Sequence, residues 1–169
     1  TTAEKKAETV RNYRGVTPDL LNDSDHFAYV IGYKDGNVRP YGLISRAETT
    51  TIFFRLLTDE TRNANSTKTN SYSDVAAGAW YNHAVSTLSA MGIVKGDSDG
   101  KFNPNASITR AEFAAIAVRF FGGEYEGEDQ FSDIGGHWAS NEINRAYINN
   151  LVKGYTDGTF RPDNDITRA

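Results

Sequence analysis

The chain has 169 residues, of which 38% are hydrophobic and 24% are charged, a balance typical of a folded globular protein rather than a disordered one. Its formal net charge is −4, from 22 acidic against 18 basic residues, which disfavours nucleic acid as a partner. The sequence contains no cysteine, which excludes disulfides, thiol catalysis and cysteine-based zinc sites. No apolar run approaches the ~20 residues needed to span a bilayer, so we expect no membrane insertion.

Residues 1–25 are assigned to an N-terminal extension, in which the sequence contains few secondary-structure signals. The charged stretch 3–14 can form a separate helix. Pro18, Asn22 and Asp23 follow it. Because proline removes a backbone donor and asparagine and aspartate compete for backbone hydrogen bonds, a long regular helix just before residue 26 is not expected.

An internal repeat organises the rest of the chain. Three segments align without a gap, at offsets of 96 − 32 = 64 and 154 − 96 = 58, and we call them the loops of copies 1, 2 and 3: Gly32–Arg46, Gly96–Arg110 and Gly154–Arg168. The shared positions are Asp35/Asp99/Asp157, Gly36/Gly100/Gly158, Pro40/Pro104/Pro162, Ile44/Ile108/Ile166 and Arg46/Arg110/Arg168. We therefore divide the chain into a divergent first repeat with a linker (26–71), a second repeat (72–130) and a truncated third repeat (131–169).

A leading helix is expected before the loops of copies 2 and 3. Tyr72-Ser-Asp-Val75 parallels Phe131-Ser-Asp-Ile134, and an apolar stripe at helical spacing follows each of them. The stripes are Trp80, Ala84, Val85, Leu88 and Met91 in copy 2, and Ile143, Ala146, Tyr147 and Leu151 in copy 3. Gly92 and Asn150 stand where a left-handed residue commonly ends a helix. In copy 1 this helix is shortened, displaced or missing, and only His26-Phe27-Ala28 resembles His137-Trp138-Ala139.

A second helix is expected after each loop. Thr109-Arg-Ala-Glu112 and Ser45-Arg-Ala-Glu48 are capping boxes, in which the hydroxyl and the carboxylate each bind a backbone amide of the first turn. The apolar stripes that follow are Phe113, Ile116, Ala117 and Phe120, ended by Gly122-Gly123, and Ile52, Phe53, Leu56 and Leu57. The polar stretches 58–71 and 122–130 are predicted to be linkers or exposed loops.

The arginine directly after each cap is the most informative feature. A positive side chain beside the positive end of the helix dipole is unfavourable by up to ~1 kcal/mol, so its presence in three copies needs a reason. One reading is an anion site, in which free backbone N–H groups and the planar guanidinium bind carboxylate or phosphate. The other reading is a structural ion pair, for example Arg110 with Asp97 or Asp99. The residues alone leave both open.

The Asp-Gly pair in each loop suggests a calcium-binding loop of the EF-hand type, but the spacing of the residues excludes it. With the glycine at position 6 of an EF-hand loop, no copy places an oxygen-donating side chain at position 1 or a glutamate at position 12. We therefore expect no metal and no cofactor, and predict a turn in which the aspartate caps the backbone and the glycine takes a positive φ. The prolines that follow favour an extended approach to the helix.

The remaining aromatic and titratable residues suggest no reaction. Trp80 and Trp138 are read as core or staple residues, or as apolar faces for a sugar ring beside the arginine. Tyr33 and Tyr155 are similar candidates. No nucleophile elbow, phosphate loop or zinc-binding histidine pair is present, and we predict that the chain is not an enzyme.

Taken together, the segments Phe131-Ser-Asp-Ile134, His137-Trp138-Ala139, Gly154–Pro162 and Ile108–Glu112 resemble the S-layer homology repeat over residues 26–169. The resemblance implies a mainly α fold in which three helix–loop–helix repeats pack around a pseudo-threefold axis. It implies a secreted bacterial module that anchors surface proteins non-covalently to the cell wall. The expected partner is secondary cell-wall polysaccharide carrying pyruvylated N-acetylmannosamine, held in grooves between repeats.

The resemblance also assigns the ligand-contacting arginine of the Thr-Arg-Ala-Glu motif. It maps onto Arg110 fully and onto Arg46 with a serine cap, whereas the Arg168 motif stops at Ala169. The expected ligand-binding residues are Arg46, Arg110, Arg168, Gly32, Gly96, Asp35, Asp99, Trp80, Trp138 and Tyr155. Grooves using Arg46 and Arg110 are the best candidates. Two alternatives remain: a structural module that self-associates in a surface layer, and an accessory domain of a surface enzyme.

Overall fold

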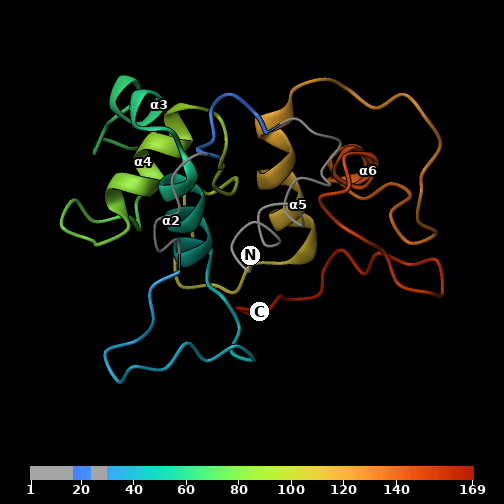
Figure 1. The fold of residues 1–169 in the computed structure, drawn as a ribbon, viewed down its shortest axis with the longest axis horizontal. Helices are drawn as coiled ribbons and strands as arrows, with labels where there is room; N and C mark the ends of the chain where they lie inside the picture. Colours follow the sequence, from blue (N-terminus) through green and yellow to red (C-terminus); the bar gives the residue numbers. More distant parts are fainter. Residues whose placement is uncertain (1–16, 24–29) are drawn as a thin grey trace, which may run out of the picture. The chain divides into compact units, whose positions relative to one another are not determined.

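The computed structural model describes residues 17–23 and 30–169, and it is mainly helical there (Figure 1). The helices are α2 (Arg46–Leu56), α3 (Asp59–Ala64), α4 (Asn82–Ala90), α5 (Arg110–Val118) and α6 (Ser140–Ile148), with a 3₁₀ turn at Arg119–Phe121. The mainly α class expected from the sequence is confirmed. The expected helix at 3–14 and the segment His26-Phe27-Ala28 lie outside the described residues.

The chain divides into two compact units: unit 1 is Thr1–Asp19 with Arg110–Asp163, and unit 2 is Leu20–Thr109 with Asn164–Ala169. In unit 2 helix α2 packs against α4, and in unit 1 helix α5 packs against α6 (Figure 1). Each unit therefore joins the second helix of one copy to the leading helix of the next copy, so neither unit coincides with one sequence repeat.

Equivalent isoleucines of the three copies close a ring of backbone hydrogen bonds inside unit 2. The Ile44 N–H donates to the Ile166 carbonyl at 3.2 Å, Ile166 donates to Ile108 at 3.1 Å, and Ile108 donates to Ile44 at 3.1 Å. Three isolated antiparallel bridges flank the ring: Leu43 with Thr167, Ser45 with Ser107, and Thr109 with Asp165. The same position of each copy thus makes the same pair of bonds, and these satisfy buried backbone groups where the three segments meet.

Helix α2 begins as the sequence predicts. The Ser45 hydroxyl accepts from the Glu48 amide at 3.2 Å, and the Glu48 carboxylate accepts from the Ser45 amide at 2.9 Å, which completes the capping box. The helix ends before Leu57, which is fully buried. The linker predicted at 58–71 is wrong at its start, because the Thr58 hydroxyl caps the short helix α3 by accepting from the Thr61 amide.

Helices α4 and α6 end as predicted, but α4 begins at Asn82, two residues after the first residue of its predicted stripe, Trp80. Gly92 and Asn150, just past their ends, have φ angles of 73° and 58°. The buried stripe of α4 contains Ala84, Val85 and Leu88, as predicted. In contrast, Tyr147 of the α6 stripe is 39% exposed.

The core of unit 1 forms where α5, α6 and the loop of copy 3 meet. Its fully buried members include Ala114, Val118, Ile134, Ile143 and Phe160. On α5 the small residues face this core, whereas the predicted Phe113 and Ala117 are only partly buried. Helix α5 continues into the 3₁₀ turn and stops at Gly122 and Gly123, both with positive φ, as the sequence predicts.

Candidate functional site

The last arginines of the three loops make equivalent contacts. Each donates from Nε to a backbone carbonyl in the loop of another copy and from Nη2 to the carbonyl of the residue directly before that loop. The pairs are Arg46 with Phe102 and Lys95, Arg110 with Phe160 and Lys153, and Arg168 with Val38 and Ile31. In that order the Nε bonds measure 2.8, 2.7 and 2.9 Å, and the Nη2 bonds measure 2.9, 2.9 and 3.3 Å. One edge of every guanidinium is therefore used to hold a neighbouring loop.

The ion pair suggested between Arg110 and Asp97 or Asp99 is wrong. The Asp97 carboxylate accepts instead from the amides of Asp99 and Lys101 and from the Asn103 side chain, all in its own loop. The Arg110 guanidinium instead contacts two backbone carbonyls and two aromatic rings.

The prediction of free backbone N–H groups at the helix start is also wrong for α2. The Arg46 amide donates to the Ala106 carbonyl at 2.9 Å, and the Ala47 amide donates to the Pro104 carbonyl at 3.0 Å. The Glu48 amide is taken by the cap. These carbonyls fill the positions an anion would use, so any anion at this place must be bound by side chains.

The Arg168 side chain is enclosed and ion-paired. Its side chain is 4% exposed, and its Nη1 lies 2.5 Å from a Glu48 carboxylate oxygen. The same oxygen accepts from the Tyr33 hydroxyl at 3.3 Å. Arg168 therefore already has an anionic partner, which the truncated motif in the sequence did not indicate.

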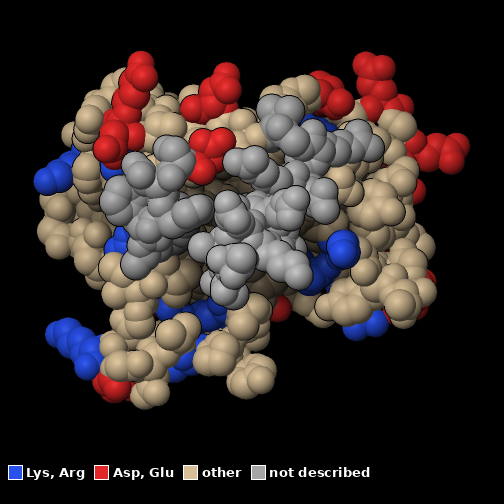
Figure 2. Space-filling view, viewed as in Figure 1, with Lys and Arg blue, Asp and Glu red and all other residues tan. Residues whose placement is uncertain are grey.

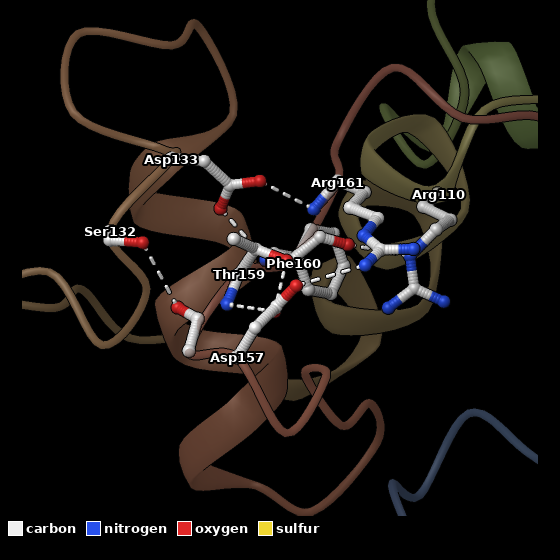
Figure 3. A network of polar contacts seen from close by, with 8 residues as sticks. Arg110, Ser132, Asp133, Asp157, Thr159, Phe160 and Arg161 are labelled. Atoms are coloured by element: carbon white, nitrogen blue, oxygen red, sulfur yellow. Dashed lines mark hydrogen bonds and ion pairs between the residues drawn. The ribbon is translucent and has the colours of Figure 1, made fainter.

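Arg110 lies against two aromatic rings, of which Figure 3 shows Phe160. Its Cζ is 4.5 Å from the centre of the Phe160 ring and 5.0 Å from that of Tyr155. Arg161 stacks on the same Tyr155 ring at 3.9 Å. Tyr155 is 41% exposed, so this cluster of two cations on one tyrosine reaches the surface. In copy 1, Tyr33 likewise receives Arg39 at 4.1 Å and Arg168 at 4.9 Å.

The Ser-Asp motif fixes the loop that Arg110 binds (Figure 3). The two carboxylate oxygens of Asp133 accept from the Phe160 and Arg161 amides, each at 2.7 Å. In copy 2 the carboxylate of Asp74 accepts from the Phe102 and Asn103 amides, each at 2.8 Å. The sequence shows the Ser-Asp motif upstream of both loops, but it predicted no role for the aspartate. This repetition was the one feature of the sequence that marked the residue.

This clamp overrides the local preference of the residue before proline. Arg39, Asn103 and Arg161 have φ angles of 55°, 56° and 57°, so the predicted extended approach to the prolines is wrong. Left-handed conformations are costly for residues other than glycine and need surrounding contacts to hold them. In copies 2 and 3 the aspartate supplies those contacts, because it fixes the amides of this residue and the one before it.

The predicted Asp-Gly turns are confirmed, except that a different aspartate caps the turn in copy 2. Gly36, Gly100 and Gly158 have φ angles of 79°, 72° and 81°. Asp35 and Asp157 accept from the amide two residues later, as a capping aspartate should. In copy 2 that role belongs to Asp97 and not to Asp99, which sits at the equivalent position.

Two of these carboxyls are strongly acidic. The pKa of Asp35 is lowered from 3.8 to about 2, chiefly by the hydrogen bond from the Arg39 guanidinium. The pKa of Asp157 is also lowered to about 2, chiefly by the hydrogen bond from the Thr159 hydroxyl and then by the Thr159 amide and Arg161. Both are anions internal to their loops, and both are bound to an arginine that reaches solvent.

The first glycine of each loop is needed for close approach. A Cβ on Gly96 would meet the Tyr72 ring and the Lys101 carbonyl, and a Cβ on Gly154 would meet the Phe131 ring. On Gly32 the Asn37 carbonyl would lie at 3.1 Å. In copies 2 and 3 the aromatic residue of the Ser-Asp motif thus packs directly on the loop backbone.

Both tryptophans lie on the surface. Trp80 is 65% exposed and Trp138 is 60% exposed, so the core reading is wrong for both. They precede their helices, which begin at Asn82 and Ser140. Their other predicted role, as apolar faces for a sugar ring, stays a prediction.

The histidines cap and pack. His137 Nδ1 accepts from the Ala139 amide at 3.2 Å, and His83 bonds to Ser66 at 2.8 Å. Burial lowers the pKa of His83, and Lys68 and Arg62 lower it further. In the described part of the chain no cluster of three acidic, histidine or cysteine side chains could hold a metal, and no described helix has the length and apolarity to cross a bilayer.

Charge on the surface is distributed in small groups. On the face drawn in Figure 2, lysines and arginines form separate patches among acidic and neutral residues, not one continuous basic field.

Comparison with known proteins identifies the repeat. The family model of the S-layer homology domain matches residues 71–114 and 130–169, which are copies 2 and 3. The chain belongs to the S-layer homology domain family. The resemblance of the motifs is therefore confirmed, and the module is a cell-surface anchoring one that is not itself catalytic.

Three relatives show the setting in which this module occurs. Cell surface glycoprotein 1 of Acetivibrio thermocellus is 38% identical over 86% of the chain and 7% of its own length. The Cellulosome-anchoring protein of the same species is 34% identical over 90% of the chain and 35% of its own length. An Amylopullulanase of Thermoanaerobacterium thermosulfurigenes is 35% identical over 83% of the chain and 8% of its own length. The chain spans about a third or less of these relatives, and its place is the bacterial cell surface.

Proposed function

We propose that this module anchors its protein non-covalently to secondary cell-wall polysaccharide by binding an anionic unit, pyruvylated N-acetylmannosamine. A pyruvyl ketal carries a carboxylate, which a planar guanidinium recognises well. Family membership and the name of the Cellulosome-anchoring relative support the wall as the target. The finer identity of the glycan rests on the resemblance and on the chemistry of the site.

The observation that carries the proposal is the state of Arg110. Two carbonyl bonds and two aromatic rings hold its guanidinium in place. A cation fixed in advance loses little conformational entropy on binding an anion. Arg46 has the same two carbonyl bonds and is the second proposed contact. Arg168 is the third proposed contact, with a side chain that is 4% exposed and paired with Glu48.

We also propose that the three copies pack about a pseudo-threefold axis through the ring of isoleucine bonds. The ring and the cyclic order of the arginine bonds support this, because copy 1 binds the loop of copy 2, copy 2 that of copy 3, and copy 3 that of copy 1. Loops and arginines would then alternate around the axis. Gly32, Gly96, Asp35, Asp99, Trp80, Trp138 and Tyr155 are proposed as the surrounding ligand contacts.

Two other roles follow from the same membership. A relative that is an Amylopullulanase supports an accessory anchoring domain on a surface enzyme. Self-association in a surface layer is the other role, and light scattering that finds a monomer at high protein concentration would count against it.

Co-sedimentation with purified cell wall tests the anchoring proposal. The wild-type protein should pellet with pyruvylated wall and remain in solution with depyruvylated wall. Arg46→Ala combined with Arg110→Ala should abolish pelleting. Arg62→Ala is the matched control, because Arg62 also binds backbone carbonyls, of Leu57 and Arg55, but lies on α3 away from the loops. Undiminished pelleting of the double variant would refute the proposal.

A further inference from the structure

The Asp-Gly pairs of the three loops share one chemical reactivity. When the main-chain nitrogen of the residue after an aspartate attacks the side-chain carboxyl carbon, a five-membered succinimide ring forms. Glycine makes this attack easiest, because it has no side chain to block the approach and its backbone has the most freedom. The pairs are Asp35-Gly36, Asp99-Gly100 and Asp157-Gly158. The sequence alone therefore makes all three candidate sites of aspartate isomerisation.

Exposure and turn geometry are alike in the three pairs. All of these residues are exposed to solvent, and the glycines have φ angles of 79°, 72° and 81° in chain order. Each glycine amide donates to the carbonyl three residues earlier, at 2.9 Å in copy 1, 3.3 Å in copy 2 and 3.1 Å in copy 3. The larger difference between the copies is in what holds the aspartate side chain.

In copies 1 and 3 two donors hold the loop carboxylate by both of its oxygens. The donors are the amide two residues later and the arginine four residues later: Asn37 and Arg39 for Asp35, and Thr159 and Arg161 for Asp157. In that order the bonds measure 3.0, 2.8, 3.0 and 2.9 Å.

These bonds oppose succinimide formation. They orient the carboxylate towards its donors and stabilise its ionised form, so that the pKa of Asp35 and that of Asp157 are lowered to about 2. The reaction expels one carboxyl oxygen as water, which is easiest from a protonated carboxyl group that can turn towards the following amide. A carboxylate held in this way must first leave its donors.

In copy 2 both donor positions bind a different aspartate. The Lys101 amide donates to Asp97 Oδ1 at 2.9 Å, and the Asn103 side chain donates to Asp97 Oδ2 at 2.7 Å. Lys101 and Asn103 are the counterparts, at the 64-residue offset, of the two donors of copy 1. Asp99 is therefore not held by the two positions that hold the equivalent aspartates of copies 1 and 3.

We propose that Asp99-Gly100 is the preferred site of spontaneous aspartate isomerisation in this chain, and that the conversion loosens the hold of the copy 2 loop on Arg46. In the first step a bond forms between the Gly100 nitrogen and the Asp99 carboxyl carbon, and the amide proton leaves with the carboxyl hydroxyl as water. In the second step water opens the ring at either carbonyl, which restores aspartate or gives isoaspartate. The mass of the product is unchanged, and the reaction needs no oxidant or cofactor.

The converted bond lies between the two carbonyls that hold Arg46. Those carbonyls belong to Lys95 and Phe102, at 2.9 and 2.8 Å from the guanidinium nitrogens. The Asp97 amide closes the loop between them by donating to the Lys101 carbonyl at 2.8 Å. Isoaspartate routes the main chain through the side-chain methylene and so lengthens the closed loop. The guanidinium should then be held less firmly.

The test incubates the whole folded chain at neutral pH and physiological temperature and follows isoaspartate in the three loops over time. Trypsin places the three pairs on separate peptides, and electron-transfer fragmentation distinguishes isoaspartate from aspartate in each. Isoaspartate should accumulate at Asp99 about tenfold faster than at Asp35 or Asp157, because those carboxylates must first break charged hydrogen bonds. As it accumulates, the Arg46 Nε–H signal in NMR spectra should shift and broaden.

Denatured protein is the matched control, because it has the same three pairs without the loop bonds. There the three pairs should react at similar rates. Arg39→Ala removes one donor from Asp35 in the folded chain and should speed the reaction of Asp35 towards that of Asp99. Asp99→Glu should stop the reaction in copy 2, because the longer side chain cannot form the five-membered ring, and its Arg46 signal should then stay constant with time.

Equal rates at the three pairs in the folded chain would overturn the proposed site, as would an Asp99 that stays unconverted while the denatured protein reacts. An Arg46 signal that does not follow the conversion of Asp99 would refute the loosening of the loop. All of these measurements are made without wall polymer, so their outcome is independent of the anchoring proposal.

Discussion

Asp133 and Arg110 both hold Phe160: its amide donates to Asp133 at 2.7 Å, and its carbonyl accepts from Arg110 Nε at 2.7 Å. The aspartate thus acts on the arginine through one residue (Figure 3). Copy 2 repeats the arrangement with Asp74, Phe102 and Arg46. The Ser-Asp motif and the arginine motif, which are far apart in sequence, therefore belong to one structural device.

We predict that Asp133→Ala destabilises the protein by about 2–3 kcal/mol, because it leaves two amides without a charged acceptor. The left-handed conformation at Arg161 would lose its support, and the Arg110 Nε–H signal in NMR spectra should move and broaden. Chemical denaturation measures the free energy of unfolding. Asp163→Asn is the control, since that carboxylate is 86% exposed and pairs with His137 at the surface, and its effect should be within about 0.5 kcal/mol. Equal effects of the two changes would contradict the clamp.

The loop aspartates predict an acid limit. Because the pKa values of Asp35 and Asp157 are lowered to about 2, their bonds add stability that is complete above the ordinary value of 3.8 and is lost as the pH falls towards 2. Carboxyl carbon NMR titration should give both midpoints directly. Arg39→Ala should raise the Asp35 pKa towards 3.8, whereas Thr159→Val should act most strongly on Asp157. Midpoints near 3.8 in the wild-type protein would show that the loop bonds do not persist in solution.

Positions set by the local chain were predictable from the sequence. The capping box at Ser45, the positive φ of Gly100 and Asn150, and the stop at Gly122 all follow from conformational preferences of single residues. Alignment of the copies then extended each of these to its counterparts.

The partners of the arginines were not predictable in this way. Arg110 binds carbonyls 43 and 50 residues away, and a carbonyl leaves no trace in the sequence because every residue has one. The exposure of Trp80 and Trp138 was missed for a different reason. Each lies two residues before its helix begins, so helical spacing does not govern the direction of its side chain.

Close packing at the loop glycine gives a third prediction. Gly154→Ala should destabilise the protein by about 1–3 kcal/mol, because the added methyl group overlaps the Phe131 ring and lies 2.9 Å from the Thr159 carbonyl. Gly78→Ala is the matched control, since a Cβ there meets nothing within 4 Å. That change should be neutral or slightly stabilising, because it restricts the unfolded chain. The thermal midpoints of the two variants test this prediction. An unchanged midpoint for Gly154→Ala would mean that Phe131 packs less closely on the loop than the structure shows.

The last prediction concerns three consecutive buried threonines in α2. The hydroxyls of Thr50 and Thr51 each donate to the carbonyl four residues earlier, at 2.8 Å. The Thr49 hydroxyl is buried and has no hydrogen-bond partner among the described residues. An unsatisfied buried hydroxyl costs about 1–3 kcal/mol, and valine has nearly the same shape and a similar helix propensity. We therefore expect Thr49→Val to raise the free energy of unfolding by about 1 kcal/mol. Thr51→Val, which removes a satisfied bond at an equally buried site, should be neutral or destabilising. A loss of stability in Thr49→Val would indicate that this hydroxyl has a partner in solution.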